Sequence, residues 1–86
     1  MNNLTDSPNI GATLAEKLVD IGINSLDELR NAGSKDILTR LASRDRNSVC
    51  LLMLYALEGT VQGIRWHGLS QDRKDELRTF YKAEIW

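Results

Sequence analysis

The stretch VCLLMLYALEG, residues 49–59, is apolar on almost every side of a helix. A helix without a polar face is normally surrounded by other helices, so this stretch predicts the central element of the fold. Leu54 lies in its middle and should be a core residue, and Cys50 should be a small buried hydrophobe. Glu58 would oppose the helix dipole near the C-terminal end, so we expect its carboxylate to contact a partner such as Arg65 or a backbone N–H group.

Helix start and stop signals divide the rest of the chain. The expected helices cover residues 12–21, 26–32, 35–43, 49–59 and 71–86. No segment shows the alternation of apolar and polar residues that is typical of a strand. The sequence therefore predicts an all-α fold, a small orthogonal bundle of about five helices joined by short loops.

Two of the helix boundaries carry specific motifs. Gly22 should adopt a left-handed conformation and end the first helix in a Schellman motif, with Ile23 folding back on Leu18. Ser25 and Glu28 have the spacing of a capping box, in which the carboxylate reaches back to the Ser25 amide.

Further caps are expected from single polar residues. Ser34 should cap the third helix, Asn47 or Ser48 the fourth, and Ser70 the last. "TVQGIRWHG", which follows Gly59, resembles a frayed helix end.

Composition limits the function. The 86 residues should form one domain, and 11 Lys and Arg residues stand against 12 Asp and Glu residues. Strong non-specific nucleic-acid binding usually goes with an excess of basic over acidic residues, which this chain lacks. The single cysteine cannot form an internal disulfide, no secretory signal is visible, and the longest near-apolar run of nine residues is too short to span a bilayer. We expect a soluble, cytoplasmic protein without membrane contact.

A basic set falls in the third expected helix and just after it. Its members are Lys35, Arg40, Arg44 and Arg46. Cations gathered on one side of a small domain could bind a phosphate backbone or an acidic partner. The more frequent alternative is an ordinary solvated face.

Other chemistry has little support in the sequence. Trp66 and His67 could stack on a base, but packing of Trp66 between the last and the central helix is the favoured alternative. His67 has no other His and no Cys nearby in sequence, so a metal site is not expected. No motif for a catalytic nucleophile, a phosphate loop or a zinc site is present. We expect a non-enzymatic protein without a cofactor or a small-molecule substrate.

The segment SPNIGATLAEKL, residues 7–18, resembles the helix–hairpin–helix pattern of DNA-binding proteins. Pro8, Ile10, Gly11 and Ala15 fill matching positions. Asn9 stands where the pattern has its first glycine, and asparagine tolerates a left-handed backbone better than most residues.

In such hairpins, consecutive backbone N–H groups at a helix N-terminus hold a phosphate. The resemblance implies possible nucleic-acid contacts at Asn9, Ile10, Gly11, Ala12 and Lys17. Acidic neighbours (Asp6, Glu16 and Asp20) argue for weak binding, because few counterions would be released. The favoured alternative is a structural corner, in which Pro8 stiffens the turn and Gly11 lets the next helix pack closely.

A closer resemblance covers nearly the whole chain. In order, PNIG, AEKLVDIGINSLDELRNAG, LLMLYALEGTVQGIRWHGL and DRKDEL are similar to the C-terminal domain of the TfoX/Sxy family, whose members regulate natural competence, the bacterial uptake of DNA. In that family the domain usually follows an α/β domain. Residues 1–86 therefore resemble a single TfoX C-terminal-type helical domain, either stand-alone or a fragment.

The resemblance implies a regulatory interaction module. Its expected partner is a protein of the transcription or competence machinery, with DNA contacts that are weak. The alternative, from another class, is a purely structural or oligomerisation module with no nucleic-acid role.

Overall fold

Residues 3–85 are described by the structure, a computed structural model of the chain. Within this range the chain forms helices and no strand: α1 (Ala12–Asp20), α2 (Leu26–Ala32), α3 (Ser34–Arg44), α4 (Leu51–Gln62) and α5 (Gln71–Phe80). Three short 3₁₀ turns cover Leu4–Asp6, Arg46–Ser48 and Trp66–Gly68, and the last turn, Tyr81–Ile85, is π-helical. The predicted all-α fold class is confirmed.

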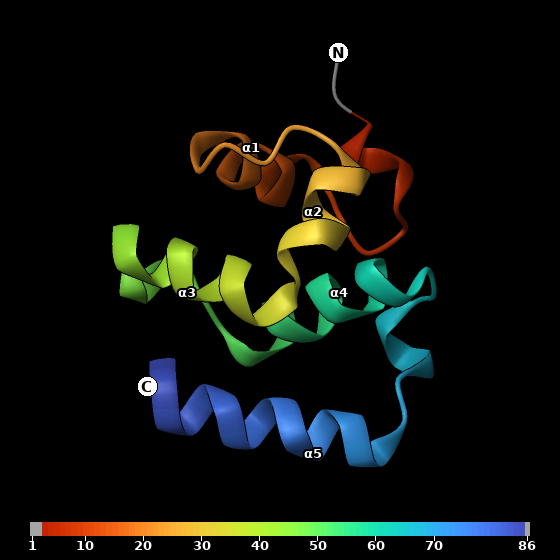
Figure 1. Cartoon of the computed structure of the whole chain (residues 1–86), viewed down its shortest axis with the longest axis vertical. Helices are drawn as coiled ribbons and strands as arrows, with labels where there is room; N and C mark the ends of the chain where they lie inside the picture. The colour runs from red at the N-terminus through yellow and green to blue at the C-terminus, as the bar shows by residue number, and fades with distance from the viewer. Residues whose placement is uncertain (1–2, 86) are drawn as a thin grey trace.

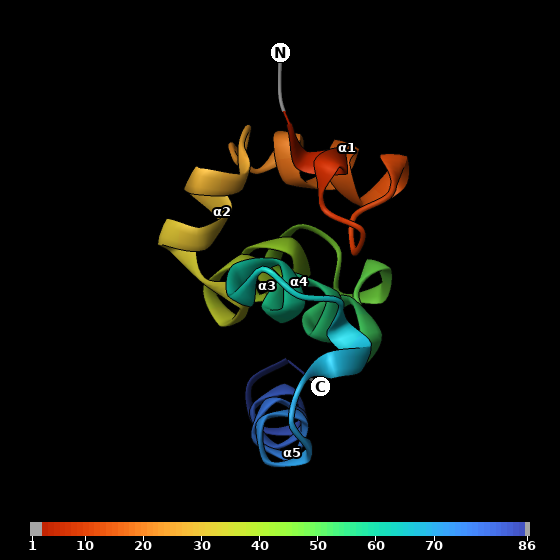
Figure 2. The same ribbon diagram turned by 90° about the vertical axis from the view of Figure 1, so that its right-hand side faces the viewer.

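The helices are arranged around α4. In Figures 1 and 2, the N-terminal part with α1 and α2 lies above α3 and α4, and α5 covers them from below. The chain direction of α2 crosses that of α3, α4 and α5 in Figure 1, as in an orthogonal bundle. Every residue of α4 from Leu54 to Thr60 is buried, as expected for a helix that neighbours cover on all sides.

The core draws on all five α-helices. Its aliphatic side chains without exposed surface in these helices are Leu18, Leu29, Ile37, Leu38, Leu54, Leu57 and Leu77. They belong to one continuous cluster, on which the half-buried Trp66, Phe80 and Tyr81 also pack. The domain is therefore held by a single core, and α4 lies at its centre.

The end of α1 has the predicted Schellman motif. Gly22 has φ +89°, its N–H donates to the Val19 carbonyl at 3.0 Å, and the Ile23 N–H donates to the Leu18 carbonyl at 2.9 Å. A left-handed residue is easiest to place with glycine, since other residues are strained there.

The start of α2 has a variant of the predicted capping box. The Ser25 hydroxyl accepts from the Glu28 N–H at 3.1 Å, as expected. The Glu28 carboxylate accepts from the Asn24 N–H at 3.2 Å instead of the Ser25 N–H. Both bonds satisfy backbone donors at the helix start.

The expected cap at Ser34 is wrong. Gly33, with φ +88°, occupies the cap position, and Ser34 is the first residue of α3. The side chain of Ser34 is buried, and its hydroxyl donates to Glu58 Oε1 at 2.6 Å. Ser34 therefore serves a contact between helices that its sequence position does not reveal. Ser70 does cap α5, because its hydroxyl accepts from the Arg73 N–H at 3.1 Å.

The expected start of α4 is also wrong. Asn47 and Ser48 lie in the 3₁₀ turn, where the Asp45 side chain accepts from the Asn47 N–H at 3.0 Å. Cys50 takes the cap position and is exposed, which corrects the expectation that it is buried. The 3₁₀ turn delays the helix, so Cys50 precedes the part of α4 that neighbouring helices cover.

The C-terminal end of α4 lies beyond Gly59. The helix continues to Gln62 and ends in a second Schellman motif at Gly63, which has φ +76°. A Cβ at Gly59 would lie 2.9 Å from the Ile64 carbonyl oxygen and 2.9 Å from the Trp66 nitrogen. Gly59 is therefore explained by the close approach of the following segment and not by a helix end.

Candidate interaction surfaces

The turn before α1 uses two of its predicted phosphate donors internally. The Asn9 N–H donates to the Ser7 hydroxyl at 3.3 Å, and the Ile10 N–H donates to the Ser7 carbonyl at 3.1 Å. Ser7 itself is buried, and its hydroxyl lies 3.0 Å from the Thr60 hydroxyl of α4. The side chain of Ile10 is buried in the core. These two residues therefore tie the turn to the protein and offer no free donor from the backbone.

The Asn9 side chain joins the turn to the segment after α4. Its Nδ2 donates to the Ile64 carbonyl at 2.7 Å, and its Oδ1 accepts from the Trp66 N–H at 2.9 Å. We call this pair of bonds the Asn9 clamp. No non-glycine residue among residues 3–85 has a positive φ, so Asn9 does not take the left-handed conformation that a hairpin glycine would allow.

Gly11 and Ala12 remain exposed at the N-terminus of α1, where no side chain caps the helix. A Cβ built on Gly11 would meet no heavy atom within 4 Å. The expectation that Gly11 allows close packing of the next helix is therefore wrong. Open space above these two residues leaves their backbone accessible from solvent.

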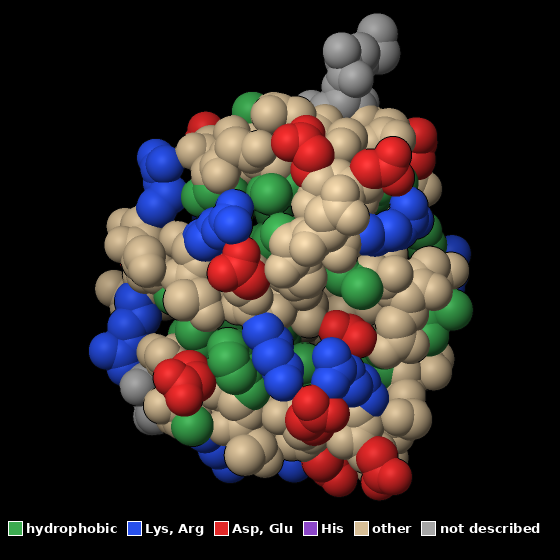
Figure 3. Space-filling model, in the orientation of Figure 1, with side chains coloured by type: hydrophobic (Ala, Val, Ile, Leu, Met, Phe, Trp, Pro, Cys, Tyr) green, Lys and Arg blue, Asp and Glu red, His purple; other side chains and the backbone are tan. Residues whose placement is uncertain are grey.

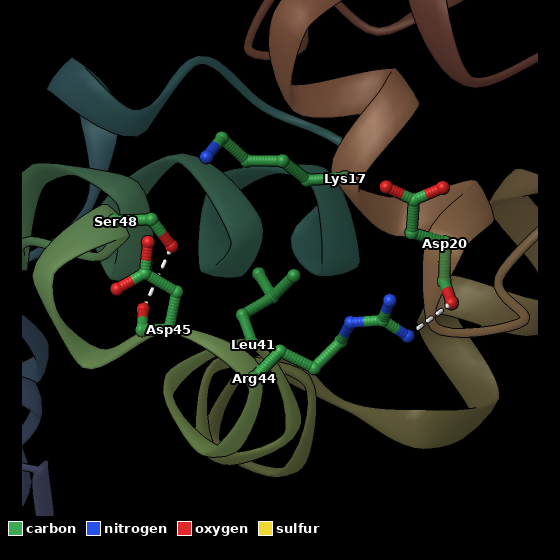
Figure 4. Close-up of a pocket in the computed structure, with 6 residues that line it drawn as sticks. All are labelled: Lys17, Asp20, Leu41, Arg44, Asp45 and Ser48. Atoms are coloured by element: carbon green, nitrogen blue, oxygen red, sulfur yellow. Dashed lines mark hydrogen bonds between the residues drawn. The ribbon is translucent and has the colours of Figure 1, made fainter.

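Lys17 lies in a hollow of about 140 Å³ between the C-terminal ends of α1 and α3. Figure 4 shows its amine extending over the hollow towards Ser48, while Arg44 approaches from α3. The Arg44 guanidinium donates to the Asp20 carbonyl at 2.8 Å. The structure thus brings together one residue from each predicted set. The Asp20 and Asp45 carboxylates line the same hollow and balance its charge.

The basic set does not form one face. Lys35 pairs with Glu76 of α5 at 3.1 Å, and Arg40 pairs with Asp36 at 2.8 Å. Arg44 contacts α1 instead. Figure 3 shows basic and acidic side chains interspersed over the visible surface, with no continuous basic patch. The structure therefore separates these cations and neutralises two of them.

Glu58 is the one Asp or Glu whose side chain is buried within residues 3–85. Its Oε1 accepts from Ser34 of α3, and its Oε2 accepts from Gln62 at 2.7 Å and from the Arg73 Nε at 3.1 Å. The expected partner Arg65 is wrong, because Arg73 of α5 makes the ion pair. Each carboxylate oxygen has at least one donor, so the burial of this charge is compensated.

Arg73 extends this ion pair over the surface of α5. Its second nitrogen, Nη1, lies 2.7 Å from Glu76, which also binds Lys35 of α3. Burial raises the pKa of Glu58, but hydrogen bonds from Arg73, Ser34 and Gln62 outweigh burial and bring the pKa below its ordinary value. The same network links α3, α4 and α5.

Trp66 and His67 lie in the 3₁₀ turn Trp66–Gly68, which follows α4. The Trp66 ring stacks on Tyr55 of α4 with 6.0 Å between centroids, and the Lys74 amine of α5 lies 5.7 Å from the Trp66 ring centroid. The predicted packing of Trp66 between these helices is confirmed. The ring of the exposed His67 stacks on the Trp66 ring, with 3.9 Å between the ring centroids. Over residues 3–85 no group of His, Cys, Asp or Glu is placed to hold a metal, and no helix is long and apolar enough to cross a membrane.

Comparison with known families identifies the chain. The family model of the TfoX C-terminal domain matches residues 1–81. The chain belongs to this family. The resemblance seen in the sequence is thereby confirmed, and it covers the turn, the central helix and α5 of this TfoX C-terminal domain.

Solved structures share the fold. A crystal structure of a protein of unknown function from Listeria monocytogenes, in a tetragonal form, is 48% identical, has a TM-score of 0.89, and aligns over 94% of this chain and 98% of that chain. A triclinic form of an uncharacterized protein from Listeria monocytogenes is 48% identical with a TM-score of 0.89, over 93% of this chain and 90% of that chain. No functionally curated protein matched.

Sequence reasoning missed two long-range contacts of this TfoX C-terminal domain. The Asn9 clamp joins residues 55 and 57 positions apart, and the Glu58–Arg73 pair joins two helices. The signal for the Asn9 clamp was the presence of asparagine where the hairpin pattern has its first glycine. Nothing local in the sequence distinguishes Arg73 from Arg65 as the partner of Glu58.

Proposed function

We propose that this TfoX C-terminal domain is a non-enzymatic module that binds a protein of the transcription or competence machinery and contacts DNA only weakly. The observation that carries the proposal is that three residues of the basic set are bound within the domain itself. Lys35 and Arg40 are paired with carboxylates, and Arg44 binds the Asp20 backbone carbonyl of α1. Membership of the TfoX family supports the regulatory setting.

Weak DNA binding follows from charge. Affinity for a duplex depends on the number of phosphates that cations neutralise, because each one releases counterions. Cations already paired with carboxylates contribute little to this release, and the chain carries a net charge of −1. A protein surface places no such demand on the charge balance.

One observation favours a second candidate, a phosphate site at the start of α1. Gly11 and Ala12 are exposed, and a Cβ at Gly11 would meet nothing. The Lys17 side chain makes no ion pair or hydrogen bond within residues 3–85, but it lies in the hollow near the C-terminal end of α1. Asp20 and Asp45 beside Lys17 oppose an anion there. The third alternative is a purely structural or oligomerisation module with no nucleic-acid role.

Titration of labelled DNA separates these functions. We expect fluorescence polarisation with duplex and single-stranded DNA to give Kd values weaker than about 10⁻⁵ M at physiological salt. Sub-micromolar binding that is lost in Gly11→Val, while circular dichroism shows intact helices, would contradict the proposal and place the site at α1. In that case Lys17→Ala should reduce the salt slope by about one.

The matched variant is Arg40→Ala/Arg44→Ala. Tight DNA binding that survives Gly11→Val but is lost in this double variant would place the site on α3 and also contradict the proposal. Sedimentation of the wild-type domain then tests the oligomerisation alternative, for which a stable dimer without any partner is the expected result.

A further inference from the structure

Two hollows meet at the Tyr81 side chain, between the start of α4 and the end of α5. One, of about 340 Å³, is lined by Leu51, Arg78, Tyr81 and Lys82. The other, of about 310 Å³, is lined by Arg46, Asn47, Val49, Tyr81 and Ile85. We call the two together the Tyr81 groove.

The floor of the Tyr81 groove is apolar and fixed. Leu51 and Tyr81 are half-buried and pack on the core, and Val49 and Ile85 belong to the core itself. The Tyr81 hydroxyl also lies 3.5 Å from the Val49 carbonyl oxygen. A partner that inserts an apolar side chain here would find a surface that is already formed.

The rim of the Tyr81 groove is cationic and unpaired. The side chains of Arg46, Arg78 and Lys82 make no ion pair, hydrogen bond or ring contact within residues 3–85. No described carboxylate lines either hollow. By contrast, the hollows beside Lys17, Val19 and Ser34 each include an Asp or Glu in their lining. The Tyr81 groove thus combines an apolar floor with positive charge that no carboxylate of residues 3–85 pairs with.

We propose that the Tyr81 groove binds an amphipathic helix of a protein partner whose apolar face is flanked by carboxylates. This inference rests on the proposed function and specifies the surface that performs it. Arg78 and Lys82 are four residues apart, so they project from successive turns at one edge of the groove. Glu or Asp residues one turn apart on the partner helix match this spacing, while its apolar side chains fill the hollows on both sides of Tyr81.

A nucleic acid fits the same surface less well. The phosphate backbone of a duplex could reach the cations of the rim, but it has no apolar group for the floor formed by Leu51, Val49 and Ile85. A protein segment can offer both carboxylates for the cationic rim and apolar side chains for the floor. The Tyr81 groove therefore suits a protein segment better than a DNA duplex. Binding of DNA at this groove is one of the outcomes that the experiment below distinguishes.

The experiment uses two fluorescein-labelled synthetic helices of about 18 residues. Both carry Leu at positions i, i+3, i+4 and i+7, and the remaining positions are Glu-rich in one peptide and Gln-rich in the other. We expect the Glu peptide to saturate the full chain below about 1 mM and to shift the amide resonances of Leu51 and Tyr81. Arg78→Glu/Lys82→Glu should weaken binding at least about tenfold, since two attractive pairs become repulsive.

The matched control, Arg30→Glu/Arg65→Glu, changes the net charge equally at exposed positions outside the groove, and it should bind the Glu peptide like the wild type. Equal binding of the Gln peptide, equal loss in the control, or no binding of the Glu peptide would overturn the proposal. Tighter binding of a DNA duplex that shifts the same two resonances would also overturn it. Failure of the groove leaves the DNA titration above unchanged, so the two proposals can fail separately.

Discussion

Replacing Leu54 with Ala is expected to lower the free energy of unfolding by roughly 2–5 kcal/mol. The Leu54 side chain has no exposed surface, and its helix, α4, lies between the N-terminal part and α5 in Figure 2. Its removal deletes buried methyl groups and leaves a cavity that close-packed neighbours fill only in part. Since small domains have a total stability of only about 5–15 kcal/mol, this loss would bring the domain close to unfolding.

Urea unfolding measures this effect, and Leu52→Ala is its matched control. Leu52 lies on the same helix but is 56% exposed, so its truncation should lower the stability by less than about 1 kcal/mol. A loss of less than about 1 kcal/mol in Leu54→Ala would show that α4 is not the centre of the core.

Arg73→Met should lower the free energy of unfolding by about 2–4 kcal/mol at neutral pH. The methionine keeps an apolar stem against α4 but leaves the buried Glu58 carboxylate without its ion pair. The expected loss is smaller than for a fully buried pair, because Ser34 and Gln62 still donate to Glu58 and the Arg73 side chain is 30% exposed.

The pH dependence identifies the cause of this loss. In the wild type the pKa of Glu58 is lowered in the folded state, so the pair stabilises the fold at neutral pH and this contribution is lost as the pH falls through the folded pKa. The stability difference between Arg73→Met and the wild type should therefore shrink as the pH falls below about 4.3, the ordinary pKa of a glutamate.

Arg78→Met is the control for this experiment, because Arg78 lies on the same helix and makes no ion pair within the described chain. Chemical unfolding at several pH values should show little change in Arg78→Met. A stability difference in Arg73→Met that does not change with pH would mean that lost packing, and not the charge of Glu58, is responsible.

Local signals predicted most of the fold. The apolar run around Leu54, the left-handed Gly22 and the cap at Ser70 all act within a few residues, and each is present in the structure. Two of the errors fall where a distant contact overrides a local preference. Ser34 gives its hydroxyl to Glu58 instead of capping α3, and Gly59 serves the approach of the segment after α4 instead of ending the helix.

The candidate sites were harder to predict for the same reason. Spacing along α3 placed Arg40 and Arg44 one turn apart, but it could not show that Asp36 pairs with one and the Asp20 carbonyl binds the other. The Tyr81 groove combines residues from the 3₁₀ turn, α4 and the last turn, which only the folded chain brings together. Sequence reasoning recovers such a surface only when its residues are close along the chain.

Asn9→Gly tests directly whether the Asn9 side chain stabilises the turn before α1, because this change replaces Asn9 with the first glycine of the DNA-binding hairpin. It removes the bonds to Ile64 and Trp66 and adds backbone freedom to the unfolded chain. Asn47→Gly is the matched control, since the Asn47 side chain makes no hydrogen bond within the described chain.

The measurement is the free energy of unfolding in urea. We expect Asn9→Gly to lose about 1–3 kcal/mol, and clearly more than Asn47→Gly, because two hydrogen bonds that hold the turn against the end of α4 are gone. Unchanged or increased stability of Asn9→Gly would contradict a structural role for the Asn9 side chain in this turn.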